Sequence, residues 1–268
     1  MSPLLQMMIE AAREAGDEIE RIYGAGCATE WKPDGSPVTE ADRAAEAIII
    51  GCLREAYPDF PVLAEEEACA GRVPELGRNW FLVDPLDGTR GFVERNGEFT
   101  VNIAHMVDDT PRAGVVYAPD ARLLYAGEIG AGAYRSRDGG PLESIGVRPP
   151  ATDCLSVVAS RSGTERTRAQ LSQLSPIRFV PSSSSLKFCL VAEGSADLYP
   201  RFGPTKEWDT GAGQAVLEAA GGCVVALDEA GRDAGWLRYG KAADEFYNPH
   251  FVASGSRELV QPWPVRSA

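Results

Sequence analysis

The chain has 268 residues, enough for one large core or for two subdomains. Its hydrophobic fraction of 44% and charged fraction of 24% are typical of a globular protein. The formal net charge of −13 disfavours binding to nucleic acid polymers or anionic membranes, although bound cations can reverse that sign locally at a phosphate site. No stretch reaches the roughly 20 apolar residues of a membrane span, and the start lacks a signal-peptide pattern. We therefore expect a cytoplasmic protein without an integral membrane segment.

The reactive residue types narrow the chemistry. The six cysteines contain no C-x-x-C pair, which predicts reduced thiols in the core or near the surface. His105 and His250 are the only histidines, so the sequence gives little support to histidine-based zinc sites or to a phosphohistidine intermediate. Any catalysis must therefore depend on carboxylates.

Two helices are predicted at the start of the chain. Ser2 and Pro3 have the pattern of a helix start, and apolar residues then recur at helical spacing until Gly24 to Gly26. Thr39, followed three residues later by Asp42, resembles the N-cap of a second helix that ends before Tyr57 and Pro58. Asp42 lies in the first turn, where the helix dipole stabilises negative charge, so a local role and a catalytic role both stay open.

Strands are predicted to follow. Residues 61–63 predict a short strand, and residues 80–83 predict a buried strand that stops before Pro85, because proline cannot extend the hydrogen-bonded ladder. Residues 99–107, 114–117 and 123–127 are separated by turn formers, which favours an antiparallel meander behind the two helices.

The pattern changes near residues 148–150. Strands are predicted over 156–160, 177–180, 196–199 and 223–227, and they alternate with helices over 165–174, 185–192 and 209–220. This alternation indicates an α/β second half. We predict an N-terminal α+β metal-binding subdomain over 1–148 and a C-terminal α/β subdomain over 149–268 that completes the site.

The strongest chemical motif follows the predicted strand at 80–83. Asp84 and Asp87 lie three residues apart on a turned backbone, and such hard oxygen ligands suit Mg²⁺ or Mn²⁺. Leu86 between them can offer its carbonyl. Gly88 and Thr89 add backbone N–H groups and a hydroxyl, the donors that hold a phosphoryl group. A surface turn is the alternative, because Asp, Pro and Gly dominate turns.

Further carboxylates strengthen the metal interpretation. The triplet Glu65 to Glu67 follows a predicted strand, and Asp209 is expected at a helix start, where it could act as a cap instead. If Glu65 and Asp209 join Asp84 and Asp87, each like-charged pair at about 4 Å costs on the order of 4 kcal/mol at an effective dielectric near 20. Such a cluster requires cations. Two divalent ions would neutralise it and could activate water for phosphate-ester hydrolysis.

Together these motifs resemble the inositol monophosphatase family, and within it the bacterial 3′(2′),5′-bisphosphate nucleotidases. The resemblance extends from the first helix to about Val252 and rests on Glu65-Glu66, Asp84 to Thr89, Arg95 to Ala104, Ser184 to Gly194, Tyr199 to Thr205, Trp208 to Gly213 and Tyr247 to Pro249. It implies a layered α/β/α/β/α fold and a lithium-sensitive, Mg²⁺-dependent phosphatase with two or three ions per site, Mn²⁺ being an alternative ion.

The resemblance also implies residue roles. Glu65, Asp84, Asp87, Asp209 and the Leu86 carbonyl would bind metal. Thr89 and Glu65 would orient the attacking water, with Asp42 in support or near a third, weaker metal position. The scissile phosphate would lie against Gly88 and Thr89. Lys187 and Arg201, with Ser184 or Ser185, would hold the second phosphate or the ribose, although a lysine and an arginine at such positions can also simply face solvent.

The implied reaction is hydrolysis of adenosine 3′,5′-bisphosphate to AMP, which would link the enzyme to sulfate assimilation; the 5′-phosphosulfate relative is a further candidate substrate. An inositol-phosphate or sugar-phosphate phosphatase with the same metal site is the alternative, and a non-catalytic Mg²⁺ or phosphate sensor is a third. Arg90-Gly91, where relatives carry Lys-Glu, and Lys206-Glu207 depart from the family pattern beside the site. Family membership also allows a homodimer and a peripheral location at the inner membrane.

Overall fold

The computed structural model describes the chain except for residues 33–34, 161–166, 169–170, 172–175 and 261–268. Among the described residues, a seven-stranded sheet has the order β3-β4-β5-β6-β7-β8-β9, with bounds Val62–Ala64, Asn79–Asp87, Thr100–Val107, Thr110–Ala118, Leu123–Glu128, Gly132–Arg137 and Glu143–Ile145. A six-stranded sheet has the order β11-β10-β12-β15-β13-β14, with bounds Ile177–Pro181, Leu155–Ala159, Leu198–Arg201, Phe251–Ser254, Cys223–Leu227 and Asp233–Trp236.

The remaining elements are a small hairpin and the helices. Strands β1 (Thr29–Trp31) and β2 (Pro37–Thr39) pair only with each other in the described part of the chain. The α-helices are α1 (Pro3–Ala25), α2 (Glu40–Ala56), α3 (Glu65–Cys69), α4 (Thr89–Val93), α6 (Leu186–Ala192) and α7 (Gly211–Ala219), and two 3₁₀ helices are η2 (Ala242–Asp244) and η3 (Arg257–Val260).

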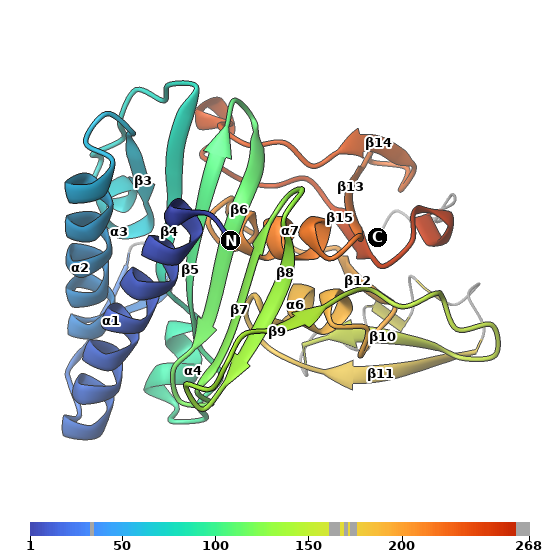
Figure 1. The fold of residues 1–268 in the computed structure, drawn as a ribbon, viewed down its shortest axis with the longest axis horizontal. Coiled ribbons are helices and arrows are strands. Elements are labelled where there is room, and N and C mark those ends of the chain that lie inside the picture. The colour runs from blue at the N-terminus through green and yellow to red at the C-terminus, as the bar shows by residue number, and fades with distance from the viewer. Residues whose placement is uncertain (33–34, 161–166, 169–170, 172–175, 261–268) are drawn as a thin grey trace.

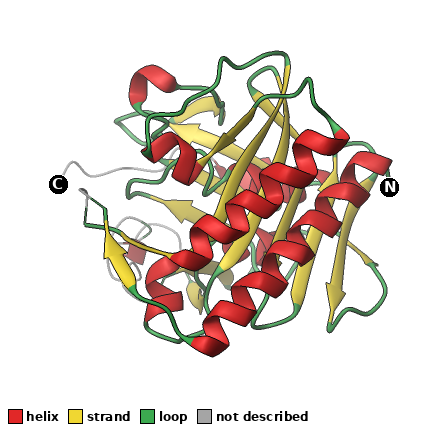
Figure 2. Ribbon diagram, turned by 90° about the vertical axis from the view of Figure 1, so that its left-hand side faces the viewer, coloured by secondary structure: helices red, strands yellow, loops and turns green. Residues whose placement is uncertain are grey.

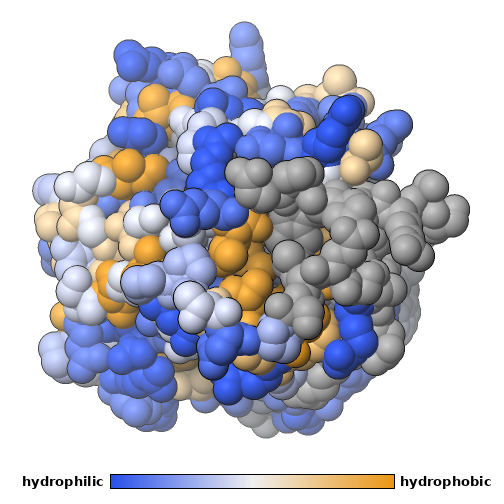
Figure 3. Space-filling model, turned by 90° about the vertical axis from the view of Figure 1, so that its right-hand side faces the viewer, coloured by the Kyte–Doolittle hydropathy of each residue, from blue (hydrophilic) through white to orange (hydrophobic). Residues whose placement is uncertain are grey.

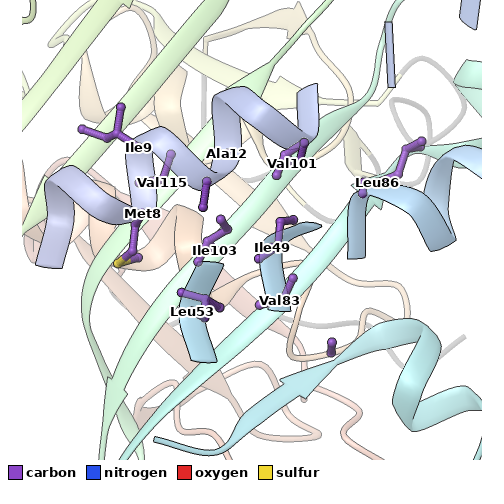
Figure 4. Packing of buried hydrophobic residues seen from close by; sticks show 14 of the residues in the cluster. Met8, Ile9, Ala12, Ile49, Leu53, Val83, Leu86, Val101, Ile103 and Val115 are labelled. Carbon is purple, nitrogen blue, oxygen red and sulfur yellow. The ribbon is translucent and has the colours of Figure 1, made fainter. Parts of the chain in front are cut away.

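The two long N-terminal helices cover one face of the seven-stranded sheet. They lie side by side across its strands, as Figures 1 and 2 show. Their apolar residues recur at helical spacing and are therefore buried against the sheet, where Met8 and Ile49 meet Val83, Ile103 and Val115 (Figure 4). The predicted helices and the meander behind them are confirmed.

Helices α6 and α7 lie between the two sheets (Figure 1). Small residues allow α7 to approach closely: a Cβ on Gly114 of β6 would collide with the carbonyl oxygen of Ala212, and one on Gly127 of β7 would lie 2.8 Å from the Cα of Val216. The outer face of the second sheet carries its own cluster, which includes Leu171 and Val260. Figure 3 views the molecule from the right-hand side of Figure 1, where hydrophobic areas are scattered among hydrophilic residues. The predicted layered fold is confirmed.

The prediction that the strand stops at Pro85 is wrong. Strand β4 continues to Asp87, and its pairing with β5 shifts register between Asp84 and Asp87. Proline is tolerated because a register shift interrupts the regular ladder there, and proline within sheets is found at such bulges. The bulge turns the strand end without ending the strand.

The second half is α/β as predicted, with two additional strands. Strands β10, β11 and β12 are parallel, whereas β15 from the C-terminal part inserts antiparallel between β12 and β13. The prediction included neither β14 and β15 of this half nor β1, β2, β8 and β9 of the first half. The helix expected over 165–174 lies largely outside the described residues.

The subdomain boundary near 148 stays a prediction. The seven-stranded sheet is built from residues before this boundary, and the six-stranded sheet is built from residues after it. However, α7 from the second half of the chain packs on strands of the seven-stranded sheet. Among the described residues, none of the helices is both long and apolar enough to cross a membrane.

Candidate active site

The β4 bulge positions the first two carboxylates. Asp84 is buried, and its Oδ1 accepts a hydrogen bond from the Leu86 N–H at 3.0 Å. Across the sheet it is in register with Asn102 of β5, and Asp87 is in register with Thr100. The turned backbone therefore brings both aspartates to one end of the sheet, as the sequence predicted.

Gly88 begins the next turn in a conformation that favours glycine. Its φ is +95°, and a Cβ there would lie 2.5 Å from Ser184 Oγ and 2.7 Å from the carbonyl oxygen of Glu98. The absence of a side chain lets the segment before α6 approach the aspartate turn. The two halves of the chain meet at this glycine.

Thr89 and Asp42 are joined directly. Thr89 Oγ1 lies 2.9 Å from Asp42 Oδ1 and 3.1 Å from the Leu86 carbonyl oxygen, and its one proton can serve one of them. Asp42 Oδ2 accepts bonds of 2.7 Å from the N–H and the hydroxyl of Thr39, which completes a capping box at the start of α2. The local role of Asp42 in the helix cap is therefore confirmed, and its contact with Thr89 places it beside the aspartate turn, where a catalytic role stays a prediction.

Glu65 is held by a residue that the sequence did not indicate. It opens α3, and its Oε1 accepts a 2.8 Å hydrogen bond from Lys32 Nζ, while Glu66 Oε1 lies 2.6 Å from the same nitrogen. Both glutamate side chains are mostly buried, so this part of the triplet is not a solvated surface.

Asp209 does not cap α7, because that helix begins two residues later and has Thr210 as its N-cap. Instead, Asp209 Oδ2 accepts a 2.9 Å hydrogen bond from the Lys206 N–H. Ser185 Oγ lies 2.7 Å from the Asp209 carbonyl oxygen and 3.3 Å from Asp87 Oδ2, and Asn102 Nδ2 donates to it at 2.9 Å. These contacts join carboxylates from both halves of the chain.

The four carboxylates repel one another. Burial, reinforced by the charges of neighbouring members of the cluster, raises the pKa of Asp84 and Asp209 well above their usual range. Burial also raises the pKa of Asp87, although Lys187 opposes this shift, and it raises the pKa of Glu65 to about 7 against the pull of Lys32. The cluster is therefore short of positive charge.

A cavity of about 620 Å³ opens beside these carboxylates. Among its lining residues are Asp87, Gly88 and Asp209, together with three cationic residues, Arg90, Lys187 and Arg201. Lys187 is buried, not solvated, and its Nζ donates to the Ser184 carbonyl oxygen at 2.6 Å. Arg201 donates from Nη2 to the Pro204 carbonyl oxygen at 2.8 Å, while its buried Nε has no hydrogen-bond partner in the described part of the chain.

The donor chemistry of the cluster fits divalent cations. The side chains offer only oxygen, the Leu86 carbonyl lies among them, and the buried charge is uncompensated. Yet no three Asp, Glu, His or Cys side chains of the described residues are gathered closely enough to hold an ion. Protein donors occupy several of their oxygens, as Lys32 does for Glu65.

Some residues of the site carried no signal in the sequence. Lys32 lies in a loop of turn formers, and its contact with Glu65 spans 33 positions along the chain. Asn102 gave a weak signal, a polar residue within an apolar strand. The predicted residues that the structure brings to the aspartate turn or the cavity are Asp42, Glu65, Asp84, Leu86, Asp87, Gly88, Thr89, Ser184, Ser185, Lys187, Arg201 and Asp209.

Similar proteins include bisphosphate nucleotidases. A CysQ 3′(2′),5′-bisphosphate nucleotidase from Salmonella typhimurium is 46% identical over 223 residues, which cover 81% of this chain and 88% of that protein. The CysQ nucleotidase of Aggregatibacter actinomycetemcomitans is 34% identical over 266 residues, which cover 97% and 95%.

Solved structures agree with these relatives. The crystal structure of CysQ from Bacteroides thetaiotaomicron, described as a bacterial member of the inositol monophosphatase family, has a TM-score of 0.75 at 38% identity and covers 93% of this chain and 96% of that one. A Thermotoga maritima IMPase has a TM-score of 0.75 at 26% identity, with coverages of 97% and 95%.

A family model decides the assignment. The model described as the inositol monophosphatase family matches residues 1–256. The resemblance inferred from the motifs, and the phosphatase class that it implied, are both confirmed. The fold, the aspartate turn and the relatives agree that the chain belongs to the inositol monophosphatase family.

Proposed function

We propose that the protein is a divalent-metal-dependent 3′(2′),5′-bisphosphate nucleotidase that hydrolyses adenosine 3′,5′-bisphosphate to AMP and phosphate. The observation that carries the proposal is the pairing of two features in one site: a buried carboxylate cluster and, in the adjoining cavity, cationic side chains that include Lys187 and Arg201. The CysQ relatives carry this substrate class in their names.

Glu65, Asp84, Asp87, Asp209 and the Leu86 carbonyl would hold Mg²⁺, or Mn²⁺ in its place, as two or three ions. When bound, the ions lower the pKa of the attacking water and neutralise the charge that develops on the leaving oxygen. The uncompensated repulsion within the cluster supports this assignment.

Thr89 and Asp42 orient the attacking water. If the Thr89 hydroxyl donates its proton to Asp42, its lone pairs can accept a hydrogen bond from water. Asp42 is itself fixed by Thr39, so the hydroxyl is held in place. Glu65 can accept a hydrogen bond from the second O–H of this water. This arrangement needs no covalent enzyme intermediate.

The phosphates occupy different parts of the cavity. The N–H groups of Gly88 and Thr89 hold the scissile 3′-phosphate, which lies against the carboxylate turn. Lys187 and Arg201, with Ser184 and Ser185, bind the 5′-phosphate or the ribose, because cations and small donors suit that task. The buried, unpaired Nε of Arg201 supports a ligand at this end. The 5′-phosphosulfate relative fits the same arrangement, and both substrates would connect the enzyme to sulfate assimilation.

The test is phosphate release from adenosine 3′,5′-bisphosphate and from inositol 1-phosphate, measured side by side with Mg²⁺, with chelator and with added lithium. We expect a strong preference for the nucleotide, loss of activity with chelator, and inhibition by lithium. A preference for inositol phosphate would refute the role of Lys187 and Arg201 while keeping the metal site. An absence of release from both would refute the enzyme assignment.

A further inference from the structure

Lys32 connects the isolated β1-β2 hairpin to the carboxylate cluster. It follows β1 directly, and the turn is held by hydrogen bonds from the Lys32 N–H to the Ser36 carbonyl and from the Gly35 N–H to the Lys32 carbonyl. The side chain extends away from the hairpin to α3 and is only 11% exposed. A lysine that is nearly buried beside a short hairpin therefore needs an anionic partner.

That partner is shared between two glutamates. The ammonium lies 2.8 Å from Glu65 and 2.6 Å from Glu66, so it neutralises a proposed metal ligand and the adjacent carboxylate at once. A divalent ion on Glu65 would lie within a few ångströms of this ammonium, and like charges at that distance repel strongly in a partly buried site.

We propose that Lys32 is an internal counter-ion for Glu65, which a divalent metal must displace, and that Glu66 retains the lysine after displacement. The inference rests on the proposed metal-dependent function. It makes Lys32 a positioning residue: it acts on the reaction through Glu65 and sets the metal affinity of the site.

A cavity beside Lys32 provides space into which its ammonium group can move. A cavity of about 870 Å³ is lined by Lys32 together with Trp31, Glu66 and Arg43. Because Glu66 lines this cavity and Glu65 does not, a small rotation about the Glu66 contact takes the lysine from the metal ligand toward open space. The same displacement frees Glu65 to approach the aspartates.

The experiment is calorimetric titration of the metal-free, full-length chain with Mn²⁺, paired with thermal unfolding. Lys32→Met should bind Mn²⁺ about 10-fold more tightly than the wild type and should unfold at a lower temperature without metal, because Glu65 then lacks a counter-ion. Arg43→Met is the matched control: Arg43 pairs with exposed Glu30 near the same hairpin and does not contact Glu65, so its Mn²⁺ affinity should stay within about twofold.

If Lys32 only stabilises the structure, Lys32→Met should not bind Mn²⁺ more tightly than the wild type. Unchanged or weaker Mn²⁺ binding by Lys32→Met would overturn the proposal, and Lys32→Gln repeats the test if the methionine variant does not fold. A wild-type chain that binds no Mn²⁺ would instead refute the proposed metal-dependent function.

Glu66→Gln tests the second part. Without its other partner the lysine stays on Glu65, so Mn²⁺ binding should weaken about 3- to 10-fold. In the Lys32→Met background the same change should have a smaller effect, because no ammonium remains to be retained. An equal effect in both backgrounds would show that Glu66 acts independently of Lys32.

Discussion

Asp84 is repelled by the other carboxylates of the site. Its pKa is raised by burial and by three other carboxylates, so a neutral side chain of the same shape removes repulsion. Asp84→Asn should lower turnover by about 10²-fold or more, because a metal ligand is lost, while the metal-free protein unfolds at the same or a higher temperature. Phosphate release and thermal unfolding measure the two effects. Near-wild-type turnover would refute the metal assignment.

Lys187 should give the enzyme an alkaline limit. Burial lowers the pKa of Lys187 to about 8 despite the attraction of Asp87, so the ammonium is lost as the pH rises through that value. We expect KM for adenosine 3′,5′-bisphosphate to rise above pH 8 and to remain flat in Lys187→Arg, whose charge persists. KM profiles from pH 6 to 10 test this. Identical profiles for the two proteins would exclude Lys187 as the group.

The lowered pKa of Lys187 also affects the stability of the fold: the charge that should help to bind substrate destabilises the folded protein. Because the folded pKa of Lys187 lies below that of an unfolded lysine, near 10.4, the charged form is penalised in the fold. The penalty is fully present below about pH 8 and is relieved as the pH approaches the unfolded value. Lys187→Met should therefore stabilise the protein most below pH 8, which urea unfolding at pH 7 and pH 10 can measure.

At the scale of elements, the close approach of α7 to the first sheet holds Asp209 near Asp84. Gly114→Ala should destabilise the protein by about 1–3 kcal/mol, because the new Cβ meets the backbone of α7. Gly51→Ala is the matched control. Gly51 lies on the exposed face of α2 with open space around it, so alanine should be neutral or should stabilise by about 0.5–1 kcal/mol. Denaturant unfolding distinguishes them, and equal effects would show that this helix contact is not tight.

At the scale of the whole molecule, the proposed metal ligands are divided between the two halves of the chain. Mn²⁺ at about 100 times its dissociation constant should stabilise the protein by roughly 2.7 kcal/mol and raise the midpoint of unfolding. Asp84→Asn and Asp209→Asn should each remove most of that shift, although they lie in different halves. Retention of the full shift by Asp209→Asn would mean that the first half binds the metal alone.

Local chemistry explains what could be predicted from the sequence. The helices at 3–25 and 40–56 follow from apolar spacing and caps, and the aspartate turn follows from residues adjacent in the chain. The motif around Asp84 and Asp209 also placed the chain in its family. Each of these inferences needs only neighbours in sequence or residue types of known coordination chemistry.

The tertiary structure decided what depends on distant partners. Pro85 ends a strand by its own chemistry, yet the bulge opposite β5 lets β4 continue to Asp87. A lysine in a turn such as Lys32 is ordinarily solvated, and only the tertiary fold, which places Glu65 and Glu66 of α3 beside its ammonium group, pairs it with Glu65. The position of β15 between β12 and β13 likewise has no local signal. The sequence by itself determined which groups can do the chemistry; long-range packing decided which charges face one another, because burial and distance set their strength.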